Sequence, residues 1–354
     1  MKALAVIALC CASATAVYAQ TFVYVALQGE KKIAVYQLDS AAGKLTHRSD
    51  AKFEGEPGAL TTDPKHQFLF AAIRSEGTLA SFKIDRATGK LTHVNTVPAG
   101  PDPAHIATDR TGCFLLTAYY VAAKVTVHAI GADGTLSEKP VQSITTADKA
   151  HAILSDPSNR FVFVPHTGPN AIFQFTFDAK TGNLTPNATP KLTTPDGSGP
   201  RHIVFHPNKD IAYVDNEQGG SVTTYALDTK AGTLKPFQTI STLPAGFKGT
   251  NACAELKIHP TGKYLYVSNR GHDSIACFRV DAQDGKLTAL TQEPTEKTPR
   301  SFDLDPSGKF LLAAGEASGK LAVYRIDDAA GTLQRVQTDD VGKQPWWVMV
   351  VELR

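Results

Sequence analysis

Gly43-Lys44-Leu45 is the first of seven copies of a short motif, a glycine followed by any residue and then leucine. The other copies begin, at spacings of 46, 45, 48, 50, 53 and 46 residues, at Gly89, Gly134, Gly182, Gly232, Gly285 and Gly331. A period in this range is typical of a repeat protein, whose units share one continuous core. The motif therefore gives the number of units and the phase in which to compare them.

A second feature, a turn dipeptide between two apolar runs, repeats in phase with the first. Its six copies are Asp63-Pro64, Asp109-Arg110, Asp156-Pro157, His206-Pro207, His259-Pro260 and Asp305-Pro306. A third run of alternating apolar and polar residues follows, as in residues 32–38, and the glycine motif then begins a fourth. Alternation of this kind predicts a half-buried strand. Four short strands in about 46 residues are typical of one blade of a β-propeller.

The two ends of the chain predict how the ring of blades closes. There are seven glycine motifs but only six turn dipeptides. The chain begins with the pattern of a second strand, residues 22–25, and ends with that of a first strand, residues 347–351. We therefore expect an all-β, seven-bladed β-propeller, closed by pairing of the C-terminal strand with the N-terminal blade, which removes an open sheet edge. Residues 20–354 would form this single domain.

The first 19 residues differ from the rest. Met1-Lys2 gives a positive start, residues 3–17 are almost wholly apolar, and Val17-Tyr18-Ala19 has the small-residue pattern of a cleavage site. This predicts a secretory signal peptide over residues 1–19, and hence a periplasmic or secreted protein with no membrane association after cleavage. The alternative is an uncleaved anchor or a buried helix, although the segment is short for a membrane span.

Composition narrows the possible ligands and partners. The net charge is +2 and no basic run stands out, which argues against a nucleic-acid surface. No metal-ligand spacing, calcium loop, phosphate loop or dinucleotide fingerprint is present, so we expect no cofactor and no metal. We expect a monomer, because a closed propeller has little need of a partner. Cys113, Cys253 and Cys277 follow the signal and are expected as buried thiols without disulfides.

Comparing the repeats in phase brings charged residues together at one end of the ring. Because the first two strands of a blade are antiparallel, the start of strand one and the end of strand two lie at the same end. The position five residues before each turn holds Gly58, Ala104, His151, Arg201, Ala254, Arg300 and, in the seventh blade, Trp346. The position eleven residues after it holds Arg74, Tyr120, Thr167, Glu217, Arg270, Glu316 and Gln28. One position away lie His105, His166, His202 and Glu255.

These residue types suit an anionic substrate. Arginine offers a planar, permanently charged fork for phosphate or carboxylate, and histidine acts as a base near neutral pH. A single arginine on a propeller rim is an ordinary solvated residue, whereas four in two facing positions favour a site. His206 and His259 take the place of aspartate in the turn and are expected to be structural.

At these positions the sequence resembles the bacterial 6-phosphogluconolactonases, seven-bladed propeller lactonases whose fold is shared by fungal 3-carboxy-cis,cis-muconate lactonising enzymes. The resemblance covers the whole chain after the signal. Its most specific stretches are Gly199-Pro200-Arg201-His202, residues 212–217, residues 254–260, residues 268–275 and Thr298-Pro299-Arg300.

The resemblance implies a site and a reaction. The family uses a histidine, two arginines and a glutamate, which fall here on His151, Arg201, Arg270 and Glu217. His151 or Glu217 would take a proton from water, and one of the two arginines would stabilise the oxyanion. The reaction would be hydrolysis of a sugar δ-lactone to the aldonic acid, which is carboxylic-ester hydrolysis. Further expected substrate contacts are Arg300, His202, Glu255, Asn251, His166 and Arg74.

The signal peptide leaves the substrate open. Phosphorylated sugar lactones are cytoplasmic intermediates, so an exported protein would instead meet an unphosphorylated or a carboxylated lactone. Two other functions are compatible with a propeller, since this fold serves many roles. One is a muconate-type lactonising cyclase or isomerase acting on an unsaturated dicarboxylate, and the other is a non-enzymatic periplasmic scaffold. The arginine-rich mouth favours the enzymes over the scaffold.

Overall fold

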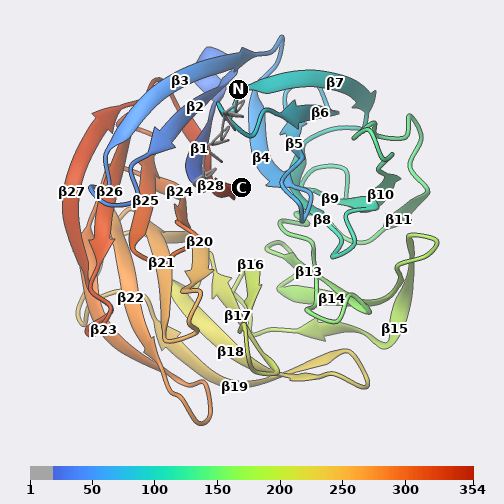
Figure 1. Cartoon of the computed structure of the whole chain (residues 1–354). Helices are drawn as coiled ribbons and strands as arrows, with labels where there is room; N and C mark the ends of the chain where they lie inside the picture. Colours follow the sequence, from blue (N-terminus) through green and yellow to red (C-terminus); the bar gives the residue numbers. More distant parts are fainter. Residues whose placement is uncertain (1–18) are drawn as a thin grey trace, which may run out of the picture.

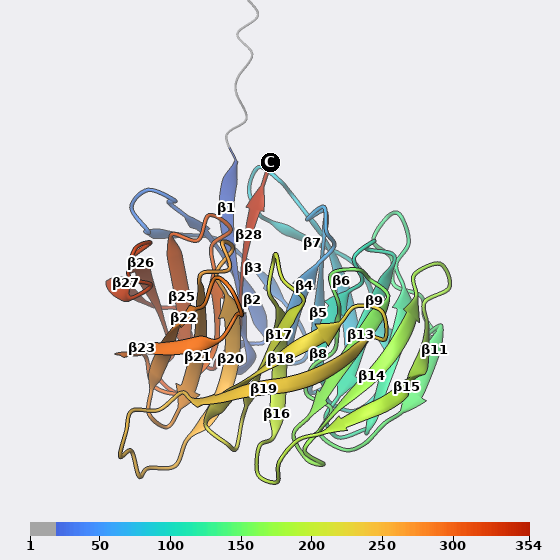
Figure 2. The same ribbon diagram turned by 90° about the horizontal axis from the view of Figure 1, so that it is seen from below.

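The computed structural model describes residues 19–354, and in this range the chain forms seven four-stranded antiparallel sheets arranged around a common axis (Figures 1 and 2). The predicted seven-bladed, all-β propeller is thereby confirmed. The predicted signal peptide lies outside the described residues except for Ala19. Within residues 19–354 no helix combines the length and the apolar character needed to cross a membrane.

Each blade runs from an inner strand near the axis to an outer strand at the rim. Blade 1 consists of β4 (Pro57–Thr62), β5 (Phe68–Ile73), β6 (Thr78–Ile84) and β7 (Leu91–Pro98). Blade 2 consists of β8 (Pro103–Thr108), β9 (Phe114–Tyr119), β10 (Lys124–Ala129) and β11 (Gln142–Thr145). Blade 3 consists of β12 (Leu154–Ser155), β13 (Phe161–His166), β14 (Ala171–Asp178) and β15 (Asn183–Thr193). Blade 4 consists of β16 (Pro200–Phe205), β17 (Ile211–Asn216), β18 (Ser221–Asp228) and β19 (Thr233–Ser241). Blade 5 consists of β20 (Ala252–Ile258), β21 (Tyr264–Arg270), β22 (Ser274–Val280) and β23 (Leu287–Pro294). Blade 6 consists of β24 (Pro299–Leu304), β25 (Phe310–Gly315), β26 (Lys320–Ile326) and β27 (Leu333–Asp340).

Blade 7 closes the ring from both ends of the chain. It consists of β28 (Pro345–Leu353), β1 (Gln20–Leu27), β2 (Lys32–Leu38) and β3 (Leu45–Lys52), with a 3-10 turn at Gln28–Glu30. Strand β1 pairs with β28 along its whole length, from Gln20 opposite Leu353 to Leu27 opposite Pro345, and the two strands lie side by side in Figure 2. The predicted closure is confirmed.

The glycines of the repeated motif join neighbouring blades. All seven have a positive φ, between +67° and +83°, as the turn into the outer strand requires. A Cβ atom at Gly232 would lie 2.0 Å from the ring of Phe161 in the preceding blade. The same close approach recurs between Gly43 and Phe310, Gly89 and Phe22, Gly134 and Phe68, Gly182 and Phe114, Gly285 and Ile211, and Gly331 and Tyr264. Each glycine is therefore both a turn residue and a point of close contact with the preceding blade.

The turn dipeptides tie the first strand of a blade to the second. Asp109 Oδ1, for example, accepts the backbone N–H groups of Cys113 and Phe114. In the turns where histidine replaces aspartate, His206 Nδ1 and His259 Nδ1 accept backbone N–H groups two residues later. These histidines thus have the structural role expected of them.

The three cysteines are free, as expected, but they do not share one environment. Cys253 and Cys277 are buried in strands, whereas Cys113 is exposed. The expectation that all three are buried is therefore wrong for Cys113. This residue precedes β9 and belongs to the turn rather than to the strand.

Six of the seven inner strands, all except β12, carry a β-bulge near their first residues. The bulges shape the mouth of the ring, meaning the end at which these strands begin. In β16 the register shifts between Pro200 and Ile203. A bulge leaves a backbone group unpaired and re-aims side chains. Asp215 Oδ1 satisfies the freed N–H of His202 at 2.7 Å, and in blade 5 Ser268 Oγ does the same for Glu255 at 3.0 Å. Side chains from the second strands therefore fix the conformation of both bulges.

Candidate active site

A small cavity at the mouth collects residues from several blades. It encloses about 10 Å³, room for about one water molecule, and its walls are Arg74, Ala104, His151, Arg201, Arg300, Trp346 and Trp347. Five of these seven occupy the position five residues before the turn, and Arg74 occupies the position eleven residues after it. Comparing the repeats in phase therefore identified most of the cavity wall. Trp347 is the residue that it missed.

His151 supplies the imidazole of the cavity. The segment before the short strand β12 holds it, and its backbone N–H donates to the carbonyl of Pro165 at 2.9 Å. Its ring packs between Tyr120 and His202, with centroid distances of 5.6 and 5.2 Å. Burial, followed by the charge of Arg201, holds the pKa of His151 well below its usual value. The ring is therefore neutral at physiological pH, and its buried Nδ1 has no hydrogen-bond partner.

Glu217 lies between two arginines. Arg270 Nη2 donates to Glu217 Oε1 at 2.5 Å, and Arg201 Nε is 3.7 Å from Glu217 Oε2. Burial alone would raise the pKa of Glu217, but Arg201 and Arg270 outweigh it and hold that pKa below its usual value. Arg270 also donates to the carbonyl of Cys253 at 3.0 Å. Glu217 is therefore an ionised carboxylate committed to ion pairs.

Beneath the cavity, Arg201 contacts a buried histidine and glutamate. Its Nη1 is 3.1 Å from His202 Nε2, and His202 Nδ1 is 3.0 Å from Glu255 Oε1. Arg201, His202 and Glu255 are 2%, 4% and 3% exposed. The sequence led us to expect that His202 and Glu255 touch substrate, and the structure buries both about as deeply as Arg201.

Trp346 packs against Arg300 and Arg74, the two remaining arginines of the mouth. The guanidinium of Arg300 lies 3.5 Å from the ring centroid of Trp346, and that of Arg74 lies 5.1 Å from it. Arg74 Nε also donates to Asp102 Oδ1 at 2.7 Å. Arg300 has a looser partner, since its Nη1 is 3.7 Å from Glu316 Oε2.

Two predicted substrate-binding residues lie elsewhere. His166 Nδ1 is bonded to the carbonyl of Val164 at 2.8 Å, and its Nε2 is bonded to Thr146 at 2.9 Å. The ring is fully buried and has no free nitrogen to offer a substrate. Asn251 precedes β20 and donates to Asn269 Oδ1 at 3.0 Å. The structure does not bring either residue to the cavity.

Asp215 is a buried carboxyl that comparing the repeats in phase did not identify. Burial raises its pKa to about 7, although Arg201 acts in the opposite direction. Its Oδ2 has no hydrogen-bond partner. The signal in the sequence is a lone acidic residue at the end of the apolar run 211–214, where a charge is costly unless it is paired.

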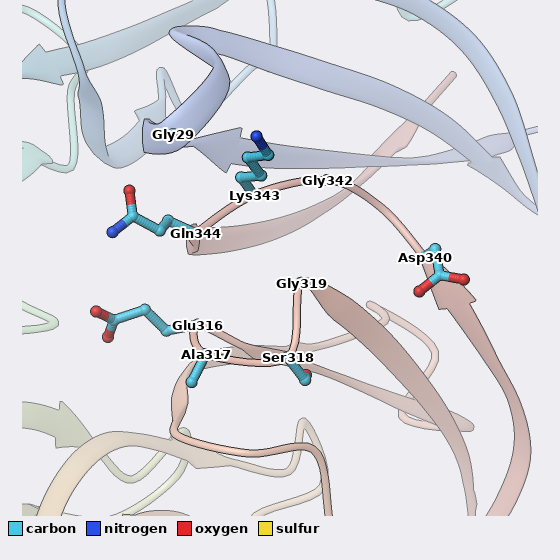
Figure 3. Close-up of a pocket in the computed structure, with 9 residues that line it drawn as sticks. All are labelled: Gly29, Glu316, Ala317, Ser318, Gly319, Asp340, Gly342, Lys343 and Gln344. Carbon is cyan, nitrogen blue, oxygen red and sulfur yellow. The ribbon is translucent and has the colours of Figure 1, made fainter.

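A wider groove opens beside the cavity, between blades 6 and 7 (Figure 3). Its lining residues are Gly29, Glu316, Ala317, Ser318, Gly319, Asp340, Gly342, Lys343 and Gln344. Figure 3 shows the Glu316 and Gln344 side chains extending in the same direction from its two facing loops. Glu316 connects the groove to the cavity, because it is also the partner of Arg300. The groove lining contains no histidine or cysteine, whereas His151 lines the smaller cavity.

The described residues do not form a metal site of the usual kind. Among residues 19–354 no group of three or more histidine, cysteine, aspartate or glutamate side chains is arranged to hold a metal ion. The groups that the cavity itself offers are a neutral imidazole and several guanidinium groups. Together they suit proton transfer from water and stabilisation of an oxyanion.

Comparison with known proteins agrees with this chemistry. A family model described as "Lactonase, 7-bladed beta-propeller" matches residues 13–350. A 6-phosphogluconolactonase of Pectobacterium carotovorum is 37% identical over 242 residues, which are 68% of this chain and 72% of that protein. A 6-phosphogluconolactonase of Erwinia tasmaniensis is 35% identical over 334 residues, which are 94% of this chain and 86% of that protein.

A solved structure extends the likeness to three dimensions. The periplasmic gluconolactonase of Pseudomonas aeruginosa superimposes with a TM-score of 0.88 at 27% sequence identity. The superposition covers 95% of this chain and all of the Pseudomonas chain.

Proposed function

Because this chain belongs to the seven-bladed β-propeller lactonase family, we propose that it hydrolyses a sugar lactone to the corresponding aldonic acid. The observation that carries the proposal is the pairing, in one small cavity, of a neutral His151 with the guanidinium of Arg201. Lactone hydrolysis needs these two groups, a base for water and a cation for the oxyanion.

The roles follow from the ionisation of each group. His151 is the base, because Glu217 is ionised and held by two arginines, which makes it a poor proton acceptor. His151 takes a proton from water as the water oxygen bonds to the lactone carbonyl carbon. Arg201 stabilises the resulting oxyanion. The ring C–O bond then breaks, and the imidazolium returns its proton to the departing alkoxide.

Arg270 and Arg300 have different parts in this scheme. Arg270 is engaged by Glu217 and by a backbone carbonyl, and it holds Glu217 in place. Arg300 and Arg74 line the cavity and bind the substrate's oxygen atoms. Neither is free to move far, because Trp346 lies against both.

We further propose that the substrate is not phosphorylated. The four arginines of the mouth face the carboxylates of Asp102, Glu217 and Glu316, and Glu255 also acts on Arg201, so at most one positive charge is left unpaired. A neutral lactone acquires a single negative charge as it becomes an oxyanion and then an aldonate. A phosphate ester would bring about −1.5 to −2 more.

We also propose that the protein is exported. The support is the positive, apolar leader ending at Ala19, directly before the first residue of β1, together with the periplasmic location named for the Pseudomonas relative. Mass spectrometry of the protein purified from a periplasmic fraction tests this proposal, because the mass identifies the first residue. We expect Gln20. An N-terminal Met1 would contradict it.

Turnover of a lactone panel tests the activity. Acid release above the spontaneous rate is measured with gluconolactone, 6-phosphogluconolactone and a carboxylated muconolactone. We expect release with gluconolactone, abolished in His151→Gln and kept in His47→Gln, whose imidazole is exposed on an outer strand. Release with only the phosphorylated or only the carboxylated lactone would contradict the proposed substrate. Release with none would contradict the activity.

A further inference from the structure

The contact between Arg201 and His202 has an unusual geometry. Arg201 Nη1 is 3.1 Å from His202 Nε2 and 3.4 Å from His202 Nδ1. A hydrogen bond in the ring plane to Nε2 would place Nδ1 on the far side of the ring, well beyond this distance. Nη1 therefore lies over the face of the imidazole, and the contact is a stack rather than an in-plane hydrogen bond.

Glu255 determines which form of the imidazole receives this stack. Burial raises the pKa of Glu255, and Lys257 and Arg201 act against that rise. Because Glu255 Oε1 also accepts the backbone N–H of Leu256 at 3.1 Å, it acts as an acceptor, and its 3.0 Å contact places the ring proton of His202 on Nδ1. Burial and then Arg201 hold the pKa of His202 well below its usual value, so the ring is neutral. A protonated ring would repel the guanidinium that lies on it.

Neighbouring rings and a backbone hydrogen bond fix the position of His202. Its ring centroid is 5.4 Å from that of His105, 5.2 Å from that of His151 and 5.9 Å from that of Trp347. Its backbone N–H is held by Asp215. Glu255 is held in turn through its own backbone N–H, which donates to Ser268. Packing and hydrogen bonds thus fix both members of the pair.

We propose that His202 and Glu255 are positioning residues for Arg201 and do not contact the substrate. The flat, neutral ring of His202 supports the guanidinium in the orientation that meets the lactone oxyanion. Glu255 fixes the tautomer of that ring through its contact with Nδ1. The inference rests on the proposed function, because it assigns Arg201 to the oxyanion.

This role predicts a graded series of variants. His202→Ala removes the support and lowers kcat by about 10- to 100-fold with little change in KM, because the oxyanion exists only in the transition state. His202→Phe retains a flat face and recovers part of that loss. Glu255→Gln retains an acceptor for Nδ1–H and costs less than Glu255→Leu. A rise in KM with kcat unchanged would instead indicate substrate binding and would overturn the proposal.

A double-mutant cycle separates positioning from direct contact. If His202 acts only through Arg201, the double variant Arg201→Ala/His202→Ala has the same kcat/KM as Arg201→Ala alone. Losses that multiply would overturn the proposal. His128→Ala is the matched control, because His128 is a fully buried histidine of blade 2 whose ring nitrogens have no partner. Its kcat should equal that of the wild type at temperatures where both proteins are folded.

Histidine NMR tests the geometry without any substrate. The long-range ¹H–¹⁵N spectrum of the protein at pH 7 should show His202 as the neutral Nδ1–H tautomer, assigned by its loss in His202→Gln. An Nε2–H tautomer or a doubly protonated ring would overturn the proposal. The spectrum does not depend on turnover. A wild-type protein that hydrolyses no lactone would contradict the proposed function, whereas the spectrum alone decides the tautomer of His202.

Discussion

His151 and Glu217 show how the arginines set the ionisation of the site. Burial lowers the pKa of a histidine and raises that of a glutamate, because it disfavours the charged form of each. The arginines favour loss of a proton from both residues. The pKa of His151 and the pKa of Glu217 are therefore both held below their usual values. The outcome is one neutral base and one fixed anion within the same cationic site.

The pH dependence of the reaction follows from this arrangement. In the proposed mechanism His151 acts in its neutral form, and its pKa in the folded protein is lowered, so the base would stay active until the pH falls through that lowered value. We expect kcat/KM to be constant from pH 8 to below 6.5, with the acid limb well under the ordinary histidine pKa. The pH–rate profile measures it. An acid limb at or above 6.5 would contradict a buried, arginine-flanked base.

Trp346 allows a second prediction about a single residue. Trp346→Ala removes the aromatic face beneath Arg300, a cation–π contact worth ~0.5–2 kcal/mol, so kcat/KM should fall by about tenfold. Trp346→Phe keeps a weaker face and should lose less. Steady-state kinetics on the best lactone measure both. Equal losses in the two variants would contradict an aromatic face as the support of Arg300.

The sequence was sufficient to place Arg74, His151, Arg201 and Arg300 at one cavity, since each lies at a repeated distance from a turn. It misplaced His166 for a physical reason. Successive side chains of a strand point to opposite faces, so a residue one position away from Thr167 turns into its own blade. The depth of His202 was also hidden, because it depends on a bulge that residue counting does not reveal.

At the scale of elements, the glycine motif is a contact between blades as well as a turn. The leucine of most copies begins the outer strand, or falls one residue inside it, as the pattern predicts. The partner of the glycine, however, lies on the second strand of the preceding blade, 71 residues away in the case of Gly232 and Phe161. Local sequence patterns predicted the strands but not this pairing, since nothing near the glycine encodes it.

A matched pair of glycines tests the contact. Gly232→Ala combines left-handed backbone strain of about 1–2 kcal/mol with a clash against Phe161, which adds about 1–3 kcal/mol. Gly197→Ala has similar strain, with φ of +74°, but its Cβ meets nothing within 4 Å. Thermal unfolding should show Gly232→Ala as the less stable protein. Equal losses would mean that the close approach contributes no stability.

The bulge of β16 gives a prediction for stability against pH. The pKa of Asp215 is raised to about 7 from 3.8, so between these values the folded protein holds a proton that the unfolded chain releases. Stability from this group is therefore present at low pH and lost as pH rises toward 7. Asp215→Asn keeps the acceptor for His202 and has no such titration. Its advantage over wild type should grow by on the order of 2 kcal/mol between pH 5 and pH 8, and an advantage independent of pH would contradict the buried, titrating carboxyl.

The whole ring depends on one strand pairing that joins the two ends of the chain. Inner strands of neighbouring blades contact one another, as β28 does with both β24 and β4. The count of motifs predicted this closure from sequence, because an unmatched strand pattern was left at each end. The substrate could not be predicted from the repeats in the same way. Its charge depends on the net charge of several ion pairs at the mouth, and these pairs differ from blade to blade.

Truncation and permutation test the closure together. Deleting residues 345–354 removes β28, which frees the edge of β1 and uncovers the parts of β24 and β4 that pack against β28, so we expect an aggregating or unfolded protein. Joining Arg354 to Gln20 by a short linker and opening the chain in the 244–250 loop retains every strand and should give a folded protein. Circular dichroism and size-exclusion chromatography measure both. A folded monomer after truncation would contradict closure by β28.

The pairing of β1 with β28 also sets an order of events during synthesis. The ribosome makes β1 among the first strands and β28 last, so blade 7 stays incomplete until nearly the whole chain has emerged. Six blades can form while the polypeptide is still growing, but the ring closes only once β28 has emerged. Until then the chain is an open arc in which β1 has a free edge, and such an edge favours pairing with other chains.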